Sequence, residues 1–424
     1  MGLEQRINYF LNRFPKLKKG LKRCYQRFSY AFSKKIKFEG NIVSITPSDG
    51  KEYFFGYYDK SPWNKTEKYM VCLRADNTWS DVSPKQPADI MLIDLTKDIS
   101  DNNRIRKIAE TRAWNVQMGC MLQWLGPTYE NKIIYNDFRN NELCSVILDI
   151  GTFEEQIINK PVFAVSSDGN FALTLDFTRL YSLRPGYGYY NLPEKTKGRG
   201  LPDEPCIWYV NLLSGESHPI LKYADFANFQ PREEMTLKGT VHKVNHIMLS
   251  PNDGRFMVLY RWFNGQRKYT RLITCKIDGT DMYLLSDDDM VSHCFWKNNN
   301  EIIAFENKHE GGTGYYLMKD KTQEYKHLWN DYCNDGHPSY SPTGKYVITD
   351  TYPNRKRIQE IKLLREQDER GKVIAKVFAP FKYDNDTRCD LHPRWDRKEE
   401  KICFDATFEG HRGLYVVPLG DKNA

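Results

Sequence analysis

The chain of 424 residues is 40% hydrophobic, 28% charged and 14% aromatic, with a mean hydropathy of −0.67, which is the composition of a folded protein with a sizeable core. No apolar run approaches the roughly 18 residues that cross a bilayer, and the first thirty residues hold no apolar core of a secretory signal. We therefore expect neither an integral membrane protein nor a standard secretory leader.

The net charge of +7 is distributed unevenly. Residues 1–38 contain eleven Lys and Arg against one Glu, a net charge of +10, whereas the rest of the chain has 51 basic and 54 acidic residues, a net charge of −3. Nucleic-acid binding requires a basic face on the folded domain, so we predict no nucleic-acid partner. The ten cysteines form no Cys-x-x-Cys pair, which favours reduced thiols, a cytoplasmic location and no cysteine-based zinc site.

Residues 1–38 have the pattern of an amphipathic helical tail. Apolar residues recur at steps of three and four from Leu3 to Phe32, and Lys and Arg occupy most other positions. Pro15 divides the pattern into two helices and lies in the first turn of the second. An aromatic stripe with a basic opposite face suits an anionic lipid surface, here the inner face of the membrane. A helix docked on the body, or a partly disordered arm, would explain the same pattern.

From residue 39 the chain changes to short strands separated by turns. One phrase, an apolar or aromatic stretch followed by a turn and a β-rich run, recurs seven times, and we call its first residues the anchor positions: Tyr57, Met121, Val162, His246, His293, His337 and His392. Repeats of about 40–50 residues with several strands each predict a β-propeller. The predicted fold is all-β, a seven-bladed β-propeller over residues 39–424 with a short α-helical N-terminal extension. The last repeat shows about three strands, so we expect residues 41–46 to complete its blade.

Four consecutive anchor positions are histidines. The first strand of each propeller blade lines the central channel, so equivalent positions converge at one end of it. We therefore predict that these imidazoles meet, and imidazole is both a common metal ligand and a base near neutral pH. The alternative is a ring of structural histidines bonded to backbone carbonyls.

Polar residues near the anchor positions extend the predicted site. Asp390 and Asp335 precede their histidines by two residues, which puts each pair on one face of a strand. Tyr58, Asp59 and Gln123 follow the first two anchor positions.

A long insertion, TRLYSLRPGYGYYN, supplies further binding candidates. Arginine forks suit carboxylates and tyrosines suit sugar faces, so we expect the segment to overhang the channel and bind an acidic oligo- or polysaccharide; the residues concerned are Arg179, Arg184, Tyr187, Tyr189 and Tyr190. A loop packed on itself is the alternative.

Several segments resemble successive blades of the oligogalacturonate lyases, among them NHIMLSPNDGRFMVLYRWF, DGHPSYSPTGKYVITD and DLHPRWDRKEEKICFDATFEGHRGLYVVPL. The resemblance covers roughly residues 50–419 and is clearest after residue 244. It implies a seven-bladed propeller that cleaves small uronides by β-elimination with a divalent metal, typically manganese, and a histidine base. The phrases HPRW and HPSYSP also occur in TolB-like propellers, so they specify the fold better than the chemistry.

Carried over by position, the resemblance makes His246 the catalytic base and makes His293 and His392 metal ligands. Asp390 stands where the family has a further histidine, and Asp is a ligand for hard cations. The family also has a glutamine roughly where this chain has Thr387. His337 would then be a substitute ligand.

These residues define two functional hypotheses. β-Elimination removes the proton next to a uronate carboxylate while that carboxylate is neutralised. Metal at the histidines and Asp390, base at His246 and an arginine from 179–184, such as Arg184, would make the protein a uronide or polysaccharide lyase. The tail and the altered metal motif favour the alternative, a membrane-peripheral propeller of surface or capsular polysaccharide biosynthesis that binds glycan as a scaffold or transfers it.

Overall fold

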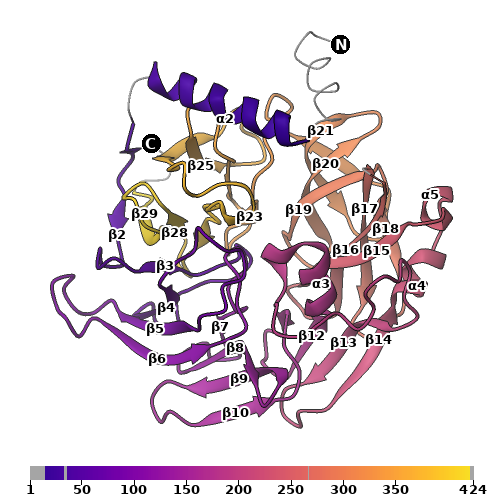
Figure 1. Cartoon of the computed structure of the whole chain (residues 1–424), viewed down its shortest axis with the longest axis horizontal. Helices are drawn as coiled ribbons and strands as arrows, with labels where there is room; N and C mark the ends of the chain where they lie inside the picture. Colours follow the sequence, from indigo (N-terminus) through magenta and orange to yellow (C-terminus); the bar gives the residue numbers. More distant parts are fainter. Residues whose placement is uncertain (1–14, 33–35, 266, 421–424) are drawn as a thin grey trace.

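Seven antiparallel sheets are arranged in a ring in the computed structural model, which describes residues 15–32, 36–265 and 267–420 (Figure 1). Each sheet is one blade, and the blades follow one another in chain order. The seven-bladed β-propeller predicted from the repeats is therefore confirmed.

The first three blades contain the four-stranded repeats whose anchor positions are not histidines. Blade 1 consists of β3 (Glu52–Phe54), β4 (Tyr69–Ala75), β5 (Ala88–Asp94) and β6 (Ile105–Thr111). Blade 2 consists of β7 (Gln123–Trp124), β8 (Lys132–Arg139), β9 (Glu142–Asp149) and β10 (Glu155–Ile158). Blade 3 consists of β11 (Ala164–Val165), β12 (Phe171–Leu175), β13 (Pro205–Asn211) and β14 (Ser217–Lys222).

The remaining blades carry the four histidines. Blade 4 consists of β15 (Val241–Leu249), β16 (Arg255–Asn264), β17 (Arg267–Lys276) and β18 (Tyr283–Ser286). Blade 5 consists of β19 (Met290–Trp296), β20 (Glu301–Lys308), β21 (Gly312–Lys319) and β22 (Tyr325–Leu328). Blade 6 has β23 (Ser339–Tyr340), β24 (Val347–Asp350), β25 (Ile358–Leu364) and β26 (Lys372–Phe378), and blade 7 has β27 (Arg394–Trp395), β28 (Lys401–Ala406) and β29 (Gly413–Pro418).

Two N-terminal strands complete the C-terminal blades. β2 (Val43–Ser44) pairs antiparallel with β29 and supplies the fourth strand of blade 7, as predicted for residues 41–46 (Figure 1). β1 (Phe38–Glu39) pairs with β26 at the outer edge of blade 6, which the sequence pattern did not predict. Pairing between the two ends of the chain closes the ring and covers edges that would otherwise stay open.

The core lies between neighbouring blades, because both faces of each inner strand are covered. Met257 and Leu259 of blade 4 belong to the same buried cluster as Cys294 and Ile302 of blade 5. Burial of one such side chain is worth about 1.5–3 kcal/mol. This packing fixes the depth of each inner strand and therefore the position of its anchor residue.

Short helices connect or cover the blades: α2 (Pro15–Ala31), α3 (Phe177–Leu183), η1 (Pro185–Tyr187), α4 (Tyr223–Asn228), α5 (Glu233–Thr236) and η2 (Asn385–Thr387). In the part of the chain that the structure describes, no helix has the length and apolar character needed to cross a membrane.

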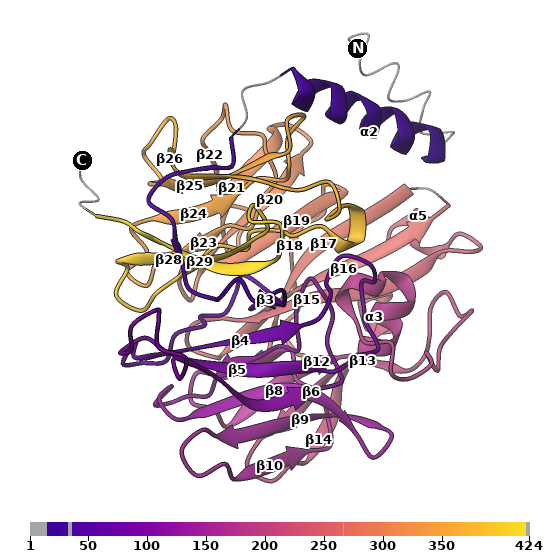
Figure 2. The same ribbon diagram turned by 60° about the vertical axis from the view of Figure 1, so that its left-hand side comes forward.

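The N-terminal helix α2 starts at Pro15, as expected from the pattern. It lies over blade 6 (Figure 2). There the Arg23 guanidinium lies 2.9 Å from Asp384, and the Tyr30 ring stacks on Phe378. This is the docked arrangement that the sequence left open as one alternative. The first predicted helix falls within residues 1–14, which lie outside the described residues.

Candidate functional site

The four anchor histidines come from the inner strands of blades 4 and 5 and from the segments that lead into the inner strands of blades 6 and 7. His246 and His293 lie within β15 and β19, and His337 and His392 lie two residues before β23 and β27. His246 and His392 have φ angles of 61° and 45°, and strand pairing in blade 4 shifts register across His246. Such bulges redirect a side chain from its normal position on the strand.

The imidazoles converge as predicted. Ring centroids are 4.1 Å apart for His293 and His337 and 4.3 Å apart for His337 and His392. Tyr58 lies among them, with its ring 5.2 Å from His337 and 5.8 Å from His246. The shared register of the anchor positions therefore predicted a real cluster.

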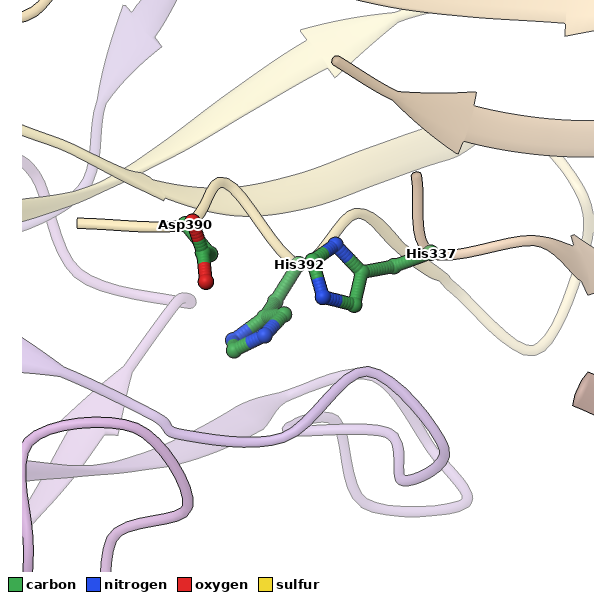
Figure 3. A group of neighbouring side chains, drawn as sticks. All are labelled: His337, Asp390 and His392. Carbon is green, nitrogen blue, oxygen red and sulfur yellow. The ribbon is translucent and has the colours of Figure 1, made fainter. Parts of the chain in front are cut away.

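His337, Asp390 and His392 form a group that can hold a metal ion (Figure 3). Each offers one ligand atom, these atoms lie within 4.8 Å of one another, and all three residues are buried. Asp390 and His392 come from the segment leading into blade 7, and His337 comes from the segment leading into blade 6. Three of the four predicted metal ligands are thus in one group.

Hydrogen bonds orient the two imidazoles of this group. The Nδ1 atom of His392 lies 2.7 Å from the Gly56 carbonyl, and that of His337 lies 2.8 Å from Asp350. Because a carbonyl only accepts, Nδ1 of His392 carries the hydrogen and Nε2 keeps its lone pair. Both Nε2 atoms are buried without a hydrogen-bond partner in the described structure, which is costly unless a ligand is bound. This is the arrangement that outer partners give to metal-binding histidines.

The charges in the group also suit a cation. Burial opposes ionisation of Asp390, but the ion pair with Arg388 outweighs it and lowers the pKa of the carboxyl. Burial, and then His337, holds the pKa of His392 well below its usual range. Burial also disfavours charge on His337, but Asp350 outweighs it and raises the pKa of that imidazole. A carboxylate and a neutral imidazole, the forms favoured at Asp390 and His392, are those that bind metal, whereas a cation would have to displace a proton from His337.

Asp350 is a functional candidate that sequence reasoning missed. Its carboxylate bonds the His337 ring and accepts hydrogen bonds from the backbone N–H groups of His337 and His392. The available signal was a carboxylate at the end of the buried strand VITD, β24, next to the HPSYSP phrase.

His293 stands beside the metal group, since its ring contacts His337 but it is not one of the three mutually close residues. Its Nδ1 lies 3.1 Å from Asp335, which also accepts a hydrogen bond from Ser292. The sequence spacing predicted that Asp335 would pair with His337, but in the structure it pairs with His293 of the preceding blade. Burial, and then His337, lowers the pKa of His293.

His246, the expected base, is fully engaged within the protein. Its Nε2 lies 3.2 Å from the Cys294 carbonyl and must carry the hydrogen, so Nδ1 accepts from the Tyr57 hydroxyl at 2.9 Å. Burial, and then His293, lowers the pKa of His246 to about 3, so the ring is neutral. Tyr57, not His246, belongs to the wall of the adjoining cavity.

That cavity has a volume of about 280 Å³ and adjoins the histidine cluster. It is lined by Tyr57, Arg184, Tyr187, Asn245, Leu259, Arg261, Lys268, Ser292, His293, Asp335, Tyr352 and Arg388. His293 connects it to the metal group, and Arg388 does so through its ion pair with Asp390. A ligand in the cavity would therefore lie next to the group that can hold the metal.

The cavity is strongly basic. In the described structure, no carboxylate lies within ion-pair distance of Arg184, Arg261 or Lys268, and Nε of Arg261 is buried without a partner. Lys243 lies directly opposite Arg261 in the strand pairing, is 2% exposed and also has no such partner. Burial, and then Arg261, holds the pKa of Lys243 well below its usual range. Asp335 also lines the cavity, but its carboxylate bonds Ser292 and the His293 ring, so the excess of cations favours an anionic ligand.

The predicted insertion contributes two residues to the cavity. Arg184 and Tyr187 line it, with the guanidinium 4.0 Å from the centre of the tyrosine ring. The structure does not bring Arg179 there, because its guanidinium is buried against Glu194 and backbone carbonyls. Tyr189 is also remote, since it is fully buried, stacks on Phe177 and is bonded by Asn136.

The other predicted binding residues, Tyr58 and Gln123, do not line the basic cavity. Tyr58 is 2% exposed, donates to the Cys294 carbonyl and lines a separate cavity of about 400 Å³ with Trp296 and Trp395. Gln123 donates to the backbone of Met121 and belongs to neither cavity.

Solved structures of other proteins share this fold, although the sequence itself has no close match. No family model matches the chain, and no curated protein matches it in sequence. Among solved structures, the oligogalacturonate lyase of Vibrio parahaemolyticus is 13% identical, covers 92% of this chain and 99% of its own, and has a TM-score of 0.62. An oligogalacturonate lyase in complex with manganese is 14% identical over 92% of this chain and 98% of its own, with a TM-score of 0.63. This chain is a seven-bladed β-propeller similar in fold to the oligogalacturonate lyases, which confirms the resemblance seen in its sequence.

Proposed function

We propose that the protein is a metal-assisted lyase that cleaves an acidic oligo- or polysaccharide by β-elimination at a uronic acid. The observation that carries this proposal is the direct contact between a cavity lined by unpaired cations and a group of buried imidazoles with free Nε2 atoms. One part suits the carboxylates of the substrate and the other suits a divalent cation. The similar fold of the oligogalacturonate lyases supports the same chemistry.

The cavity residues would bind the carboxylates of successive sugar units. Arg184 and Arg261 offer planar guanidinium groups that can form two parallel hydrogen bonds to a carboxylate, and Lys268 adds a point charge. The Tyr187 ring contacts the Arg184 guanidinium, which helps to fix its position.

His337, Asp390 and His392 would hold the metal, and His293 lies beside them. We propose manganese, because a structural neighbour was solved in complex with it and because a carboxylate with imidazoles is an acceptable ligand set for that ion. When bound, the cation would neutralise the uronate carboxylate and make the adjacent C–H group more acidic.

Tyr57 and His246 would remove the proton as a pair. Burial raises the pKa of Tyr57, so its hydroxyl is neutral and donates to Nδ1 of His246. The sugar C5 proton would pass to the Tyr57 oxygen as the phenolic hydrogen moves to His246. The C–H electrons then form the C4–C5 double bond, the C4–O bond breaks, and the departing oxygen takes a proton from water. His246 thus acts through a residue that touches the substrate.

The first test is an absorbance assay for unsaturated uronate. The purified full chain, loaded with Mn²⁺, is incubated with oligogalacturonate and, in parallel, with a neutral oligosaccharide of the same length. We expect metal-dependent formation of the conjugated product from the acidic substrate alone. Failure with a panel of uronides of different linkage, in metal-loaded protein, would contradict the proposed reaction.

The metal and proton-transfer roles are separated by four variants. His392→Ala and His337→Ala should lose Mn²⁺ binding in equilibrium dialysis. Tyr57→Phe and His246→Ala should keep Mn²⁺ but lose about 100-fold or more in kcat, the usual contribution of a positioned acid or base. Tyr209→Phe changes a tyrosine of blade 3 that does not line the cavity; it is the matched control and should retain activity. Normal turnover in Tyr57→Phe would contradict the relay and leave His246 as a direct base.

The engagement of His246 favours a second candidate function. Both of its ring nitrogens are bonded and it does not line the cavity, as in a site that binds without reacting. The protein would then be a glycan-binding propeller of surface or capsular polysaccharide biosynthesis. This candidate predicts tight binding of acidic oligosaccharide with no bond cleavage and with no loss of binding in His246→Ala.

A further inference from the structure

The docked helix α2 is oriented with its apolar side toward solvent. Leu21, Tyr25, Phe28 and Phe32 are 49%, 49%, 63% and 79% exposed. They are spaced by four, three and four residues, so they form one stripe along the helix. We call these four residues the aromatic stripe.

The opposite side of the helix contacts the propeller. Arg23 donates to the Phe381 carbonyl and pairs with Asp384, Gln26 is 6% exposed, and Tyr30 stacks on Phe378. A helix whose only role is to cover blade 6 would bury its apolar side. Here the more polar side is used for docking. Within the aromatic stripe, Tyr25 accepts a hydrogen bond from Arg355, whereas Phe28 and Phe32 are the most exposed and are left for another partner.

The charge of the segment identifies that partner. Residues 1–38 carry a net charge of +10, and six of the eleven basic residues fall within the sequence of α2. A second copy of the chain would bring an equal positive charge against the stripe, which disfavours self-association. Anionic lipid headgroups attract such a segment while the acyl boundary accepts exposed Phe, Tyr and Leu side chains.

We propose that α2 is an interfacial helix that attaches the propeller to an anionic lipid bilayer through the aromatic stripe. The helix rests on residues 378–384, and Arg388 and Asp390 of the candidate site follow within six residues. This inference is independent of the reaction that the site performs.

The test is flotation of the purified full chain with vesicles of phosphatidylcholine alone or with about one-third phosphatidylglycerol. We expect binding to the anionic vesicles only, with a loss as salt rises, because surface charge attraction is screened. The variant Phe28→Ser with Phe32→Ser should bind at least tenfold more weakly. The matched control, Ile99→Ser with Leu213→Ser, changes two similarly exposed apolar side chains on other blades and should bind as the wild type does.

Three outcomes would overturn the proposal: no binding of the wild type to anionic vesicles, equal binding of the stripe variant, or a lipid-free oligomer that only the stripe variant dissociates. The last would assign the stripe to a second copy. Because the stripe lies outside the cavity, turnover of soluble oligogalacturonate should be the same in wild type and stripe variant. Loss of lipid binding and loss of lyase activity are therefore distinguishable results.

Discussion

Among the described residues, buried cations in one region of this propeller are paired with a carboxylate, whereas those in another region are not. Arg394 is 1% exposed and bonds Asp405, itself 1% exposed, as well as the Tyr57 carbonyl. In contrast, Arg261 is 5% exposed and faces Lys243 across the strand pair with no carboxylate partner in the described structure. The first arrangement supports the fold, whereas the second costs stability and makes sense when an anion occupies the cavity.

The largest expected effect is on a paired cation. Arg394→Met leaves Asp405 buried without its partner and should lower the free energy of unfolding by about 3–5 kcal/mol, measured by urea denaturation. Metal affinity should fall as well, since the Gly56 carbonyl binds both Arg394 and the His392 ring. Arg261→Met is the matched control and should not destabilise the protein. Equal destabilisation of the two variants would remove the distinction between the regions.

Replacing a buried cation that lacks a carboxylate partner should stabilise the protein. Lys243→Met should raise the free energy of unfolding by about 1–4 kcal/mol, the range seen when buried ion pairs give way to apolar side chains, because it removes the cost of burying an amine that has no carboxylate partner in the described structure. The folded pKa of Lys243 is depressed, so the unfolded chain binds more protons and wild-type stability rises with pH up to the unfolded pKa near ~10.4. The gain in Lys243→Met should therefore shrink as pH rises toward that value. A destabilised variant, or a gain independent of pH, would show that Lys243 is compensated within the fold.

The cavity cations should matter mainly for ligand binding. Arg261→Met should weaken oligogalacturonate binding by about 10–100-fold, because charge-assisted hydrogen bonds contribute about 1.5–3 kcal/mol. Isothermal titration calorimetry on the metal-loaded protein measures this. Arg267→Met removes an exposed arginine from the next strand, where it is paired with Asp289, and should leave affinity unchanged. Unchanged affinity in Arg261→Met would assign the basic cavity no role in binding.

The repeats predicted the fold and the histidine cluster well, for a physical reason. Register in a half-buried strand fixes both depth and facing of a side chain, so equal positions in successive blades must converge. The same argument placed residues 41–46 in blade 7, because a blade with three strands leaves an open edge. β1 was missed, since two residues give no alternating pattern.

The loop residues were predicted less well. Arg179 and Tyr189 have the right chemistry for a sugar site, but insertion loops fold by tertiary contacts that no periodicity describes. Asp350 and Arg261 lie in strands and were overlooked, although a charged residue within a buried apolar strand such as RFMVLYRWFN is a usable signal. The tail pattern predicted a helix but not which side would contact the body.

The smallest expected effect concerns the most exposed cavity cation. Arg261, followed by burial, lowers the pKa of Lys268 to about 8. An anion prefers the protonated amine, so binding of oligogalacturonate should weaken as pH rises through about 8, at most tenfold because Lys268 is exposed and its charge is screened. Lys268→Met should bind more weakly at pH 7 and lose this step. In Arg261→Met the step should move to higher pH, since the largest cause of the shift is gone. Calorimetric titrations between pH 7 and pH 10 on the three proteins measure both changes. If the change in affinity near pH 8 persists in Lys268→Met, another group titrates there and Lys268 does not interact with the bound ligand.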